Sequence, residues 1–183
     1  ETREYLAARG LNEDVIKDFR LGYSPKAGLR ATLHQHEIAD ELIKTAGLIG
    51  VSDKDGSFYD YFRNRVMFPI ENRQGQIIAF GARAFGDAKP KYLNSPEGPA
   101  FSKKAVLYGW RQARERVRRS LPLMIVEGYM DVIAVSGSGV AAALAPLGTA
   151  LTEEQIQLVW KLHDEPILCF DGDVAGLKAA ARA

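Results

Sequence analysis

Two short acidic motifs hold the residues best suited to chemistry. Glu127 follows the apolar run 123–126, and the Asp-Gly-Asp motif 171–173 follows the apolar run 167–170. Each run predicts a buried strand, and a stretch that predicts a helix comes after each motif. In open α/β sheets, ligands bind at the carboxyl ends of the strands. The two motifs therefore predict a single acidic site at one edge of a sheet.

The residue types at this edge favour a divalent cation. Three converging carboxylates repel one another, and a bound cation relieves that repulsion. Asp171 and Asp173 are two residues apart, so an extended backbone points both side chains the same way. Such hard oxygen donors favour Mg²⁺ or Mn²⁺ over zinc. The alternatives are a surface carboxylate beside a helix dipole for Glu127, and a polar turn with a helix cap for the aspartates.

Charge is distributed unevenly along the 183-residue chain, although the net charge is only +1. Residues 61–119 carry 13 Lys/Arg and 4 Asp/Glu, whereas the other residues carry 11 basic and 19 acidic side chains. This division favours a polyanion-binding face beside an acidic centre. The alternative is an ordinary solvated surface. No apolar run is long enough to span a bilayer, and the single cysteine excludes an intrachain disulfide, which fits a cytoplasmic setting.

The first part of the chain predicts helices followed by a β-hairpin. Helices are expected over 4–9, from an Asn12 cap to near Gly22, and around 37–45. Alternating apolar residues at 66–70 and 77–80, separated by a turn at 72–75, predict the hairpin. Residues 86–104 predict an ordered loop, and 110–119 a helix with five arginines.

From residue 121 onward, strands alternate with helices. Strands are expected at 123–126, 140–144 and 167–170, with a helix after each, which predicts a parallel sheet with right-handed crossovers. Thr152 and Gln155 form a capping box for the second helix, whose inner face would include Trp160. Cys169, in the last apolar run, is expected to be buried.

The unit from about residue 121 resembles the Toprim domain of bacterial primases, topoisomerases and some nucleases, whose signatures are a Glu and an Asp-x-Asp. The upstream residues narrow the resemblance to bacterial DnaG-type primases. It rests on the strings Tyr61 to Ile70, Ala79 to Arg83, Pro90 to Glu97, Phe101 to Lys103, Leu107 to Gly109 and Glu127 to Asp131.

The resemblance implies an α/β chain in two parts. Residues 1–119 would form a basic, mixed α+β N-terminal subdomain of the primase catalytic core, and 120–183 a Toprim parallel-sheet subdomain truncated at its C-terminus. The implied activity is synthesis of short RNA primers on single-stranded DNA by metal-dependent nucleotidyl transfer. Mg²⁺ or Mn²⁺ would be the cofactor, with zinc only in a further domain of the family. The implied location is the cytoplasm, at the nucleoid, without a membrane.

The resemblance also assigns site residues. Glu127, Asp171 and Asp173 would be the catalytic and metal-binding residues, with Glu127 either a ligand or a proton-transfer group. The template and nucleotide would contact Arg63, Arg65, Arg83, Lys91, Asn94, Lys103, Tyr129 and Asp131. For Arg65 and Arg83, the alternative is charge on the hairpin surface. The implied partners are the single-stranded DNA template, ribonucleoside triphosphates and the RNA primer, with the replicative helicase and single-stranded DNA-binding protein contacting other regions.

Two alternatives stay open at this point. One is a Toprim fragment of a topoisomerase, and the other is a non-catalytic module that binds single-stranded nucleic acid. The family's third acidic motif, a downstream Asp-Pro-Asp, does not occur in the printed sequence. We therefore expect this chain to be inactive, or nearly so, as a primase by itself.

Overall fold

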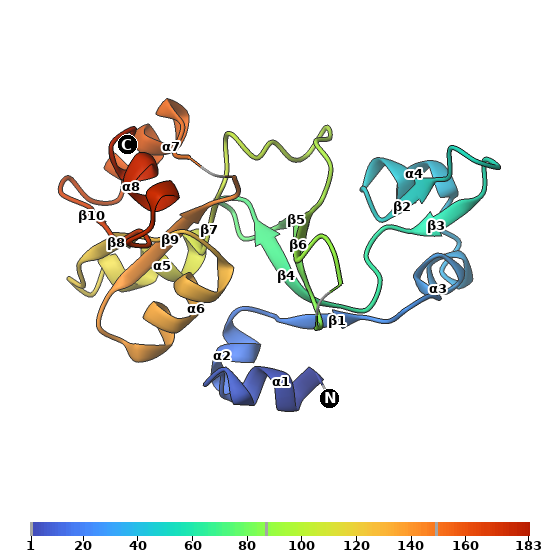
Figure 1. Cartoon of the computed structure of the whole chain (residues 1–183), viewed down its shortest axis with the longest axis horizontal. Coiled ribbons are helices and arrows are strands. Elements are labelled where there is room, and N and C mark those ends of the chain that lie inside the picture. Colours follow the sequence, from blue (N-terminus) through green and yellow to red (C-terminus); the bar gives the residue numbers. More distant parts are fainter. Residues whose placement is uncertain (1, 87, 149) are drawn as a thin grey trace.

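The computed structural model describes residues 2–86, 88–148 and 150–183. Figure 1 shows three parts in a row: a sheet with flanking helices, a central antiparallel sheet, and a small lobe of helices and a hairpin. The helices of the described residues are α1 (Thr2–Ala8), α2 (Glu13–Asp18), α3 (Leu29–Gln35), α4 (Asp40–Thr45), α5 (Trp110–Val117), α6 (Tyr129–Ser138), α7 (Glu153–Trp160) and α8 (Val174–Ala180).

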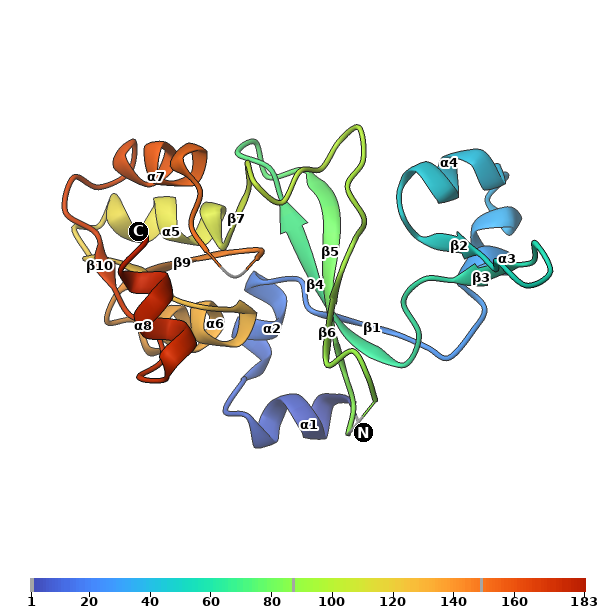
Figure 2. The same cartoon turned by 45° about the horizontal axis from the view of Figure 1, so that its top comes forward.

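The central sheet is antiparallel, with strand order β1-β4-β5-β6. Its strands are β1 (Gly22–Ser24), β4 (Arg65–Glu71), β5 (Ile77–Ala84) and β6 (Tyr92–Asn94). The predicted hairpin is confirmed as β4 and β5. Side chains alternate between two buried faces: Val66 and Phe68 belong to one apolar cluster, and Met67 and Ala82 to another. Helices α1 and α2 cover the Val66 face, as Figures 1 and 2 show.

The small lobe pairs β2 (Ile49–Val51) with β3 (Phe58–Asp60) beside α3 and α4. Asp60 fixes the start of α3, because its carboxylate accepts hydrogen bonds from the backbone N–H groups of Gly28, Leu29 and Arg30 at 2.8–3.1 Å. A side-chain acceptor at a helix start satisfies amides that the helix itself leaves unpaired.

The second sheet has the order β10-β8-β9-β7. Its strands are β7 (Leu107–Tyr108), β8 (Leu123–Ile125), β9 (Ala142–Pro146) and β10 (Ile167–Leu168). The predicted parallel arrangement is confirmed for β10, β8 and β9, whereas β7 is an antiparallel edge strand. In β9, Ala143 and Ala145 share an apolar cluster with α6, and Ala142 and Leu144 share another with α5 and α7. Both faces are thus buried, as is usual for parallel strands.

The predicted fold class is confirmed, since an antiparallel hairpin unit precedes a unit of parallel strands and helices. The domain boundary between 119 and 120 stays a prediction. In the structure, β7 and α5 precede that boundary and yet pack into the second sheet. No helix among the described residues is long and apolar enough to cross a membrane.

Several local expectations were wrong. The predicted loop 86–104 contains β6, although its residue 87 lies outside the described residues. The helix expected to reach Gly22 ends at Asp18, and Gly22 begins β1. Cys169 is exposed rather than buried, because the short β10 is an edge strand with half-exposed apolar side chains. Trp160, at the end of α7, is 58% exposed instead of facing inward.

Candidate active site and its basic surroundings

The structure brings Glu127 and the 171–173 segment together at one edge of the second sheet. β8 and β10 are parallel neighbours, so the residues that follow them leave the sheet side by side. The Glu127 Oε1 atom accepts a hydrogen bond from the backbone N–H of Asp171 at 2.8 Å. The glutamate therefore fixes the path of the backbone that carries the first aspartate.

Asp173 begins helix α8. Its Oδ1 atom accepts hydrogen bonds from the backbone N–H groups of Ala175 and Gly176, both at 2.8 Å. Gly176 packs directly beneath the acidic segment: a Cβ there would overlap the Asp171 carbonyl and lie 2.8 Å from Glu127 Oε1. The predicted helix-cap role of the motif is present, and it engages one oxygen of Asp173.

Asp131 is a fourth acidic residue near this edge. It lies in the first turn of α6, where its Oδ2 atom accepts a hydrogen bond from the Gly128 backbone N–H at 3.0 Å. Burial raises the pKa of the Asp131 carboxyl, and the negative charge of Asp171 raises it further.

The donor set matches a hard divalent cation in chemistry, since its side chains offer carboxylate oxygens. Within residues 2–86, 88–148 and 150–183, however, no three His, Cys, Asp or Glu side chains are close enough to hold a metal ion. The three-carboxylate convergence expected from the sequence is thus not formed in this structure. The assignment of Glu127, Asp171 and Asp173 as metal ligands stays a prediction.

Arg83 lies on the face of the central sheet that α1 covers. It pairs in register with Val66 and Tyr92, and it is only 6% exposed. Its guanidinium lies 5.0 Å from the ring centroid of Tyr5 and 5.8 Å from that of Tyr92. Its Nε atom is buried without a hydrogen-bond partner in the described residues. The surface-charge alternative is therefore wrong for Arg83, which two aromatic rings hold in place.

Arg65 lies on the opposite face of the same sheet. Because it is two residues from Met67 in β4, its side chain lies on the sheet face that carries Met67 and Ala82. Arg65 is 7% exposed. Its Nη1 atom donates a hydrogen bond to the Pro90 carbonyl at 2.8 Å, and burial, followed by the charge of Arg63, lowers its pKa. The surface-charge alternative is wrong here also, and the predicted basic residues do not share one face.

The remaining predicted cations are more accessible. Arg63 is exposed, with its guanidinium 5.2 Å from the Tyr59 ring centroid, and Lys91 is exposed beside β6. Lys103 is half-buried, and its backbone is fixed at both ends: its N–H donates to Glu97 Oε1 at 3.0 Å, and its carbonyl accepts from Gln155 Nε2 at 2.9 Å. These cations are free to meet an anion without a large rearrangement.

Asn94 and Tyr129 connect the two sheets. The Tyr129 hydroxyl donates to Asn94 Oδ1 at 2.6 Å, and Asn94 Nδ2 donates to the Leu147 carbonyl at 2.9 Å. The Tyr129 ring stacks on Phe68 with centroids 4.9 Å apart, and burial raises the pKa of its phenol. A Cβ at Gly81 would overlap this ring, so only glycine permits the approach. Both predicted nucleotide contacts are thus engaged within the protein.

Sequence reasoning missed several residues that position this region. Tyr5 and Tyr92 hold Arg83 in place. Tyr92 belongs to the Pro90 to Glu97 string, but that string gave it no role. No local pattern pairs Tyr5 with a strand so distant in the sequence. Gln155 was expected only as part of a capping box. It is 1% exposed and also donates to the carbonyls of Lys103 and Val106, so it fastens the long loop to α7.

Comparison with known proteins agrees with this architecture. Residues 1–114 match the family described as DNA primase catalytic core, N-terminal domain, and residues 122–183 match the Toprim domain. A DNA primase of Pseudomonas aeruginosa is 48% identical over 98% of this chain, and one of Halalkalibacterium halodurans is 44% identical over 99%. The chain spans 27% and 31% of the length of these two relatives.

Solved structures show the same likeness. A DNA primase domain from Pseudomonas aeruginosa superposes with a TM-score of 0.88 at 48% identity, covering 98% of this chain and 57% of the other. A DnaG primase catalytic domain bound to single-stranded DNA superposes with a TM-score of 0.86 at 40% identity, and the match covers 99% of this chain and 57% of the other. The match over residues 1–114 removes the topoisomerase alternative. The chain belongs to the DnaG-type DNA primase family, in which it comprises the N-terminal domain of the catalytic core and Toprim sequence.

Proposed function

We propose that this chain forms part of a primase that synthesises short RNA primers on single-stranded DNA by metal-dependent nucleotidyl transfer. The observation that best supports the proposal is the direct contact between Glu127 and the Asp171 backbone at the shared edge of β8 and β10. A carboxyl edge of parallel strands is where open α/β sheets bind ligands. The cytoplasm, at the nucleoid, is the location that this activity implies.

Glu127, Asp171 and Asp173 are the residues that would hold the cation, with Mg²⁺ or Mn²⁺ as the hard cation that their oxygens suit. When bound, the cation would neutralise charge on the phosphates that react. Asp173 already uses Oδ1 to cap α8, so its Oδ2 atom is the one available to a cation. Glu127 keeps Asp171 in place through Oε1 and can offer Oε2 as a ligand or proton acceptor.

The basic residues of the central sheet and its loops would hold the polyanions. Lys91 and Arg63 are exposed and would bind template phosphates, whereas Arg83 is enclosed between two rings, so a phosphate would reach its guanidinium only if one of those rings moved. Asn94 and Tyr129 would act by positioning, because their polar atoms join β6 to α6 and to Leu147. Arg65 and Lys103 complete the proposed template and nucleotide contacts.

The proposed partners are the DNA template, ribonucleoside triphosphates and the RNA primer. Contacts with the replicative helicase and with single-stranded DNA-binding protein would involve other regions of the whole protein, as would any zinc. A second candidate is a non-catalytic nucleic-acid-binding module. It is the candidate that the unformed three-ligand acidic cluster in the described residues would fit.

Titration with Mn²⁺, followed by electron paramagnetic resonance, tests the metal site in this chain. We expect weak binding that the Asp171→Asn, Asp173→Asn double variant reduces by about tenfold or more. Asparagine is as good a helix cap as aspartate, so the thermal unfolding midpoint should change little. The matched control is Asp53→Asn plus Asp55→Asn, another Asp-x-Asp pair, located in the exposed turn between β2 and β3. Equal Mn²⁺ affinity in both double variants would refute the assignment.

A further inference from the structure

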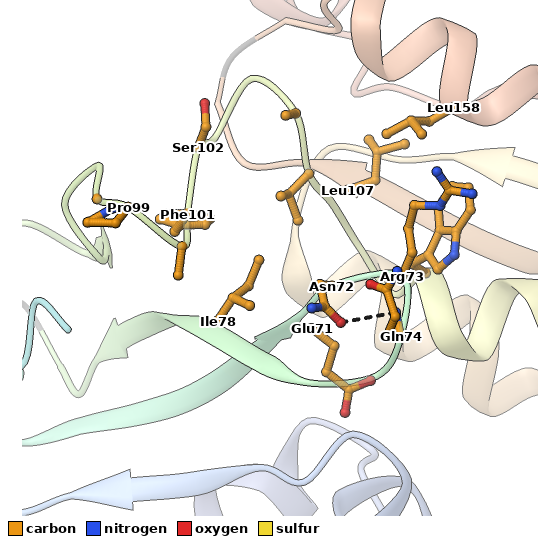
Figure 3. Close-up of a pocket in the computed structure, with 15 residues that line it drawn as sticks. Glu71, Asn72, Arg73, Gln74, Ile78, Pro99, Phe101, Ser102, Leu107 and Leu158 are labelled. Atoms are coloured by element: carbon orange, nitrogen blue, oxygen red, sulfur yellow. Dashed lines mark hydrogen bonds between the residues drawn. The ribbon is translucent and has the colours of Figure 1, made fainter.

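An apolar cleft lies where the two sheets meet, apart from the acidic edge. Its volume is about 360 Å³, within the ~300–1,000 Å³ typical of small-molecule sites. One wall is the β4–β5 turn, and the other is the loop that runs from residue 98 to 107 (Figure 3). None of its lining residues belongs to the proposed metal site or to the basic residues predicted from the sequence.

The body of the cleft suits a flat, apolar ring. Phe101, Leu107 and Trp110 are 4%, 2% and 6% exposed, so the walls are fixed by core packing on both sides. Ile78 from β5 and Leu158 from α7 complete the apolar lining. Since strands and helices of both sheets provide these walls, the cleft exists before any ligand enters.

One end of the cleft is cationic. Arg73 is exposed, its guanidinium lies 5.9 Å from the Trp110 ring centroid, and it forms no ion pair with the described residues. The nearby Glu71 does not neutralise it, because Arg20 and Arg111 bind that carboxylate at 3.3 and 3.1 Å. The complement of this end is an anionic group attached to an apolar ring.

The same turn offers a hydrogen-bonding side chain beside the cation. Figure 3 shows Arg73 and Gln74 on the turn side of the cleft, facing a loop that carries Pro99, Phe101 and Ser102. The side-chain amide of Gln74 makes no hydrogen bond to the described part of the chain. The dashed line at Gln74 in Figure 3 is the bond from its backbone N–H to Asn72 Oδ1. An amide of this kind can pair with the polar edge of a planar ring.

We infer that this cleft binds an unstacked nucleotide, with the base against the apolar walls, its edge at Gln74 and its phosphate at Arg73. The ring, the polar edge and the anion match the three parts of the cleft, and the local sequence is strongly basic. The nucleotide belongs either to a nucleic-acid strand or to the free pool. Only the choice of ligand class rests on the proposed function, because the cleft shares no residue with the acidic edge.

Fluorescence of Trp110 tests the inference. Trp160→Phe leaves Trp110 as the only tryptophan, and it replaces an exposed ring. Adenosine monophosphate and a single-stranded deoxyadenosine oligonucleotide are titrated separately into this chain. Saturable quenching by the mononucleotide identifies a free-nucleotide site, and quenching by the oligonucleotide alone identifies a strand site; both support the cleft. No saturable quenching by either ligand would overturn the inference.

Two variants locate the binding. Ala105→Phe, at an exposed lining position, should fill the cleft and abolish quenching with an unchanged melting temperature. Arg73→Gln should weaken binding about tenfold, as expected for a lost charge-assisted contact. Arg118→Gln removes the same charge from the exposed end of α5 and should have little effect. Quenching that survives Ala105→Phe, or that falls equally in both arginine variants, would contradict the inference. Mn²⁺ binding should stay unchanged in all of them, which separates this test from that of the acidic site.

Discussion

The Tyr129 hydroxyl donates a 2.6 Å hydrogen bond to Asn94 Oδ1, and this contact joins the helix after the Glu127 strand to the edge strand of the central sheet. The Asn94 Nδ2 atom donates a hydrogen bond to the carbonyl of Leu147, the residue that follows β9. One side chain thus connects three segments around the acidic edge. Its role is to fix their relative positions.

Tyr129→Phe should therefore lower the free energy of unfolding by roughly 1 to 2 kcal/mol, because the part-buried amide oxygen of Asn94 loses its donor. Urea unfolding measures the change. The matched control is Tyr23→Phe, which removes a 2.8 Å bond from a tyrosine hydroxyl to Asn64 on the exposed surface and should cost about 0.5 kcal/mol or less. Equal losses in the two variants would show that the Tyr129 bond has no special structural role.

Alkaline pH should destabilise the chain through its buried phenols. Burial raises the pKa of Tyr129 and of Tyr108 above the ordinary value of 10.0. Above about pH 10 the unfolded chain releases these protons while the native chain retains them, so the stability that is fully present below pH 10 declines as pH rises.

Unfolding midpoints in urea between pH 8 and about pH 11 test this expectation. The Tyr129→Phe variant should show a smaller decline than the wild type, whereas Tyr23→Phe, which removes an exposed phenol, should retain the full decline. An identical pH dependence in all three proteins would mean that Tyr129 ionises as readily in the native state as in the unfolded state.

Lys91 should contribute to DNA binding without contributing to stability. Its side chain is exposed, so Lys91→Gln should leave the melting temperature nearly unchanged. If it contacts one phosphate of single-stranded DNA, the slope of log affinity against log salt should decrease in magnitude by about 0.7. A salt series of DNA affinity provides the slope.

Arg119→Gln is the charge-matched control, because Arg119 is an exposed cation just beyond α5. It should not alter the slope. Arg83→Gln should change both the slope and the melting temperature, since this arginine is packed between Tyr5 and Tyr92. If Lys91→Gln and Arg119→Gln shift the slope equally, general surface charge accounts for the binding.

Regular, strongly patterned elements could be predicted from the sequence. The β4–β5 hairpin follows from alternation around an Asn-Arg-Gln-Gly turn, and the parallel sheet follows from three apolar runs separated by helices. The Asn12 and Thr152 caps are also where their side chains indicate. Such features depend on residues close together in the chain, so local physics specifies them.

Elements that depend on distant partners escaped prediction. β1 and β6 have three residues each and exist because β4 and β5 pair with them. At the site, the order of the predicted strands was enough to place Glu127 beside the 171–173 segment. The burial of Arg65 and Arg83 on opposite faces could not be predicted, because it depends on the pleat of the complete sheet. Composition showed that the region is basic and could not show which cations are enclosed.

The most direct test of the proposed function is template-dependent ribonucleotide incorporation by a full-length primase that carries this chain. The account predicts that Asp171→Asn lowers incorporation by a factor of about one hundred or more while affinity for single-stranded DNA stays the same, because the acidic edge would hold the cation that stabilises charge on the reacting phosphates and would not bind the template. Incorporation at the wild-type rate by the Asp171→Asn protein would contradict the assignment of catalysis to this edge.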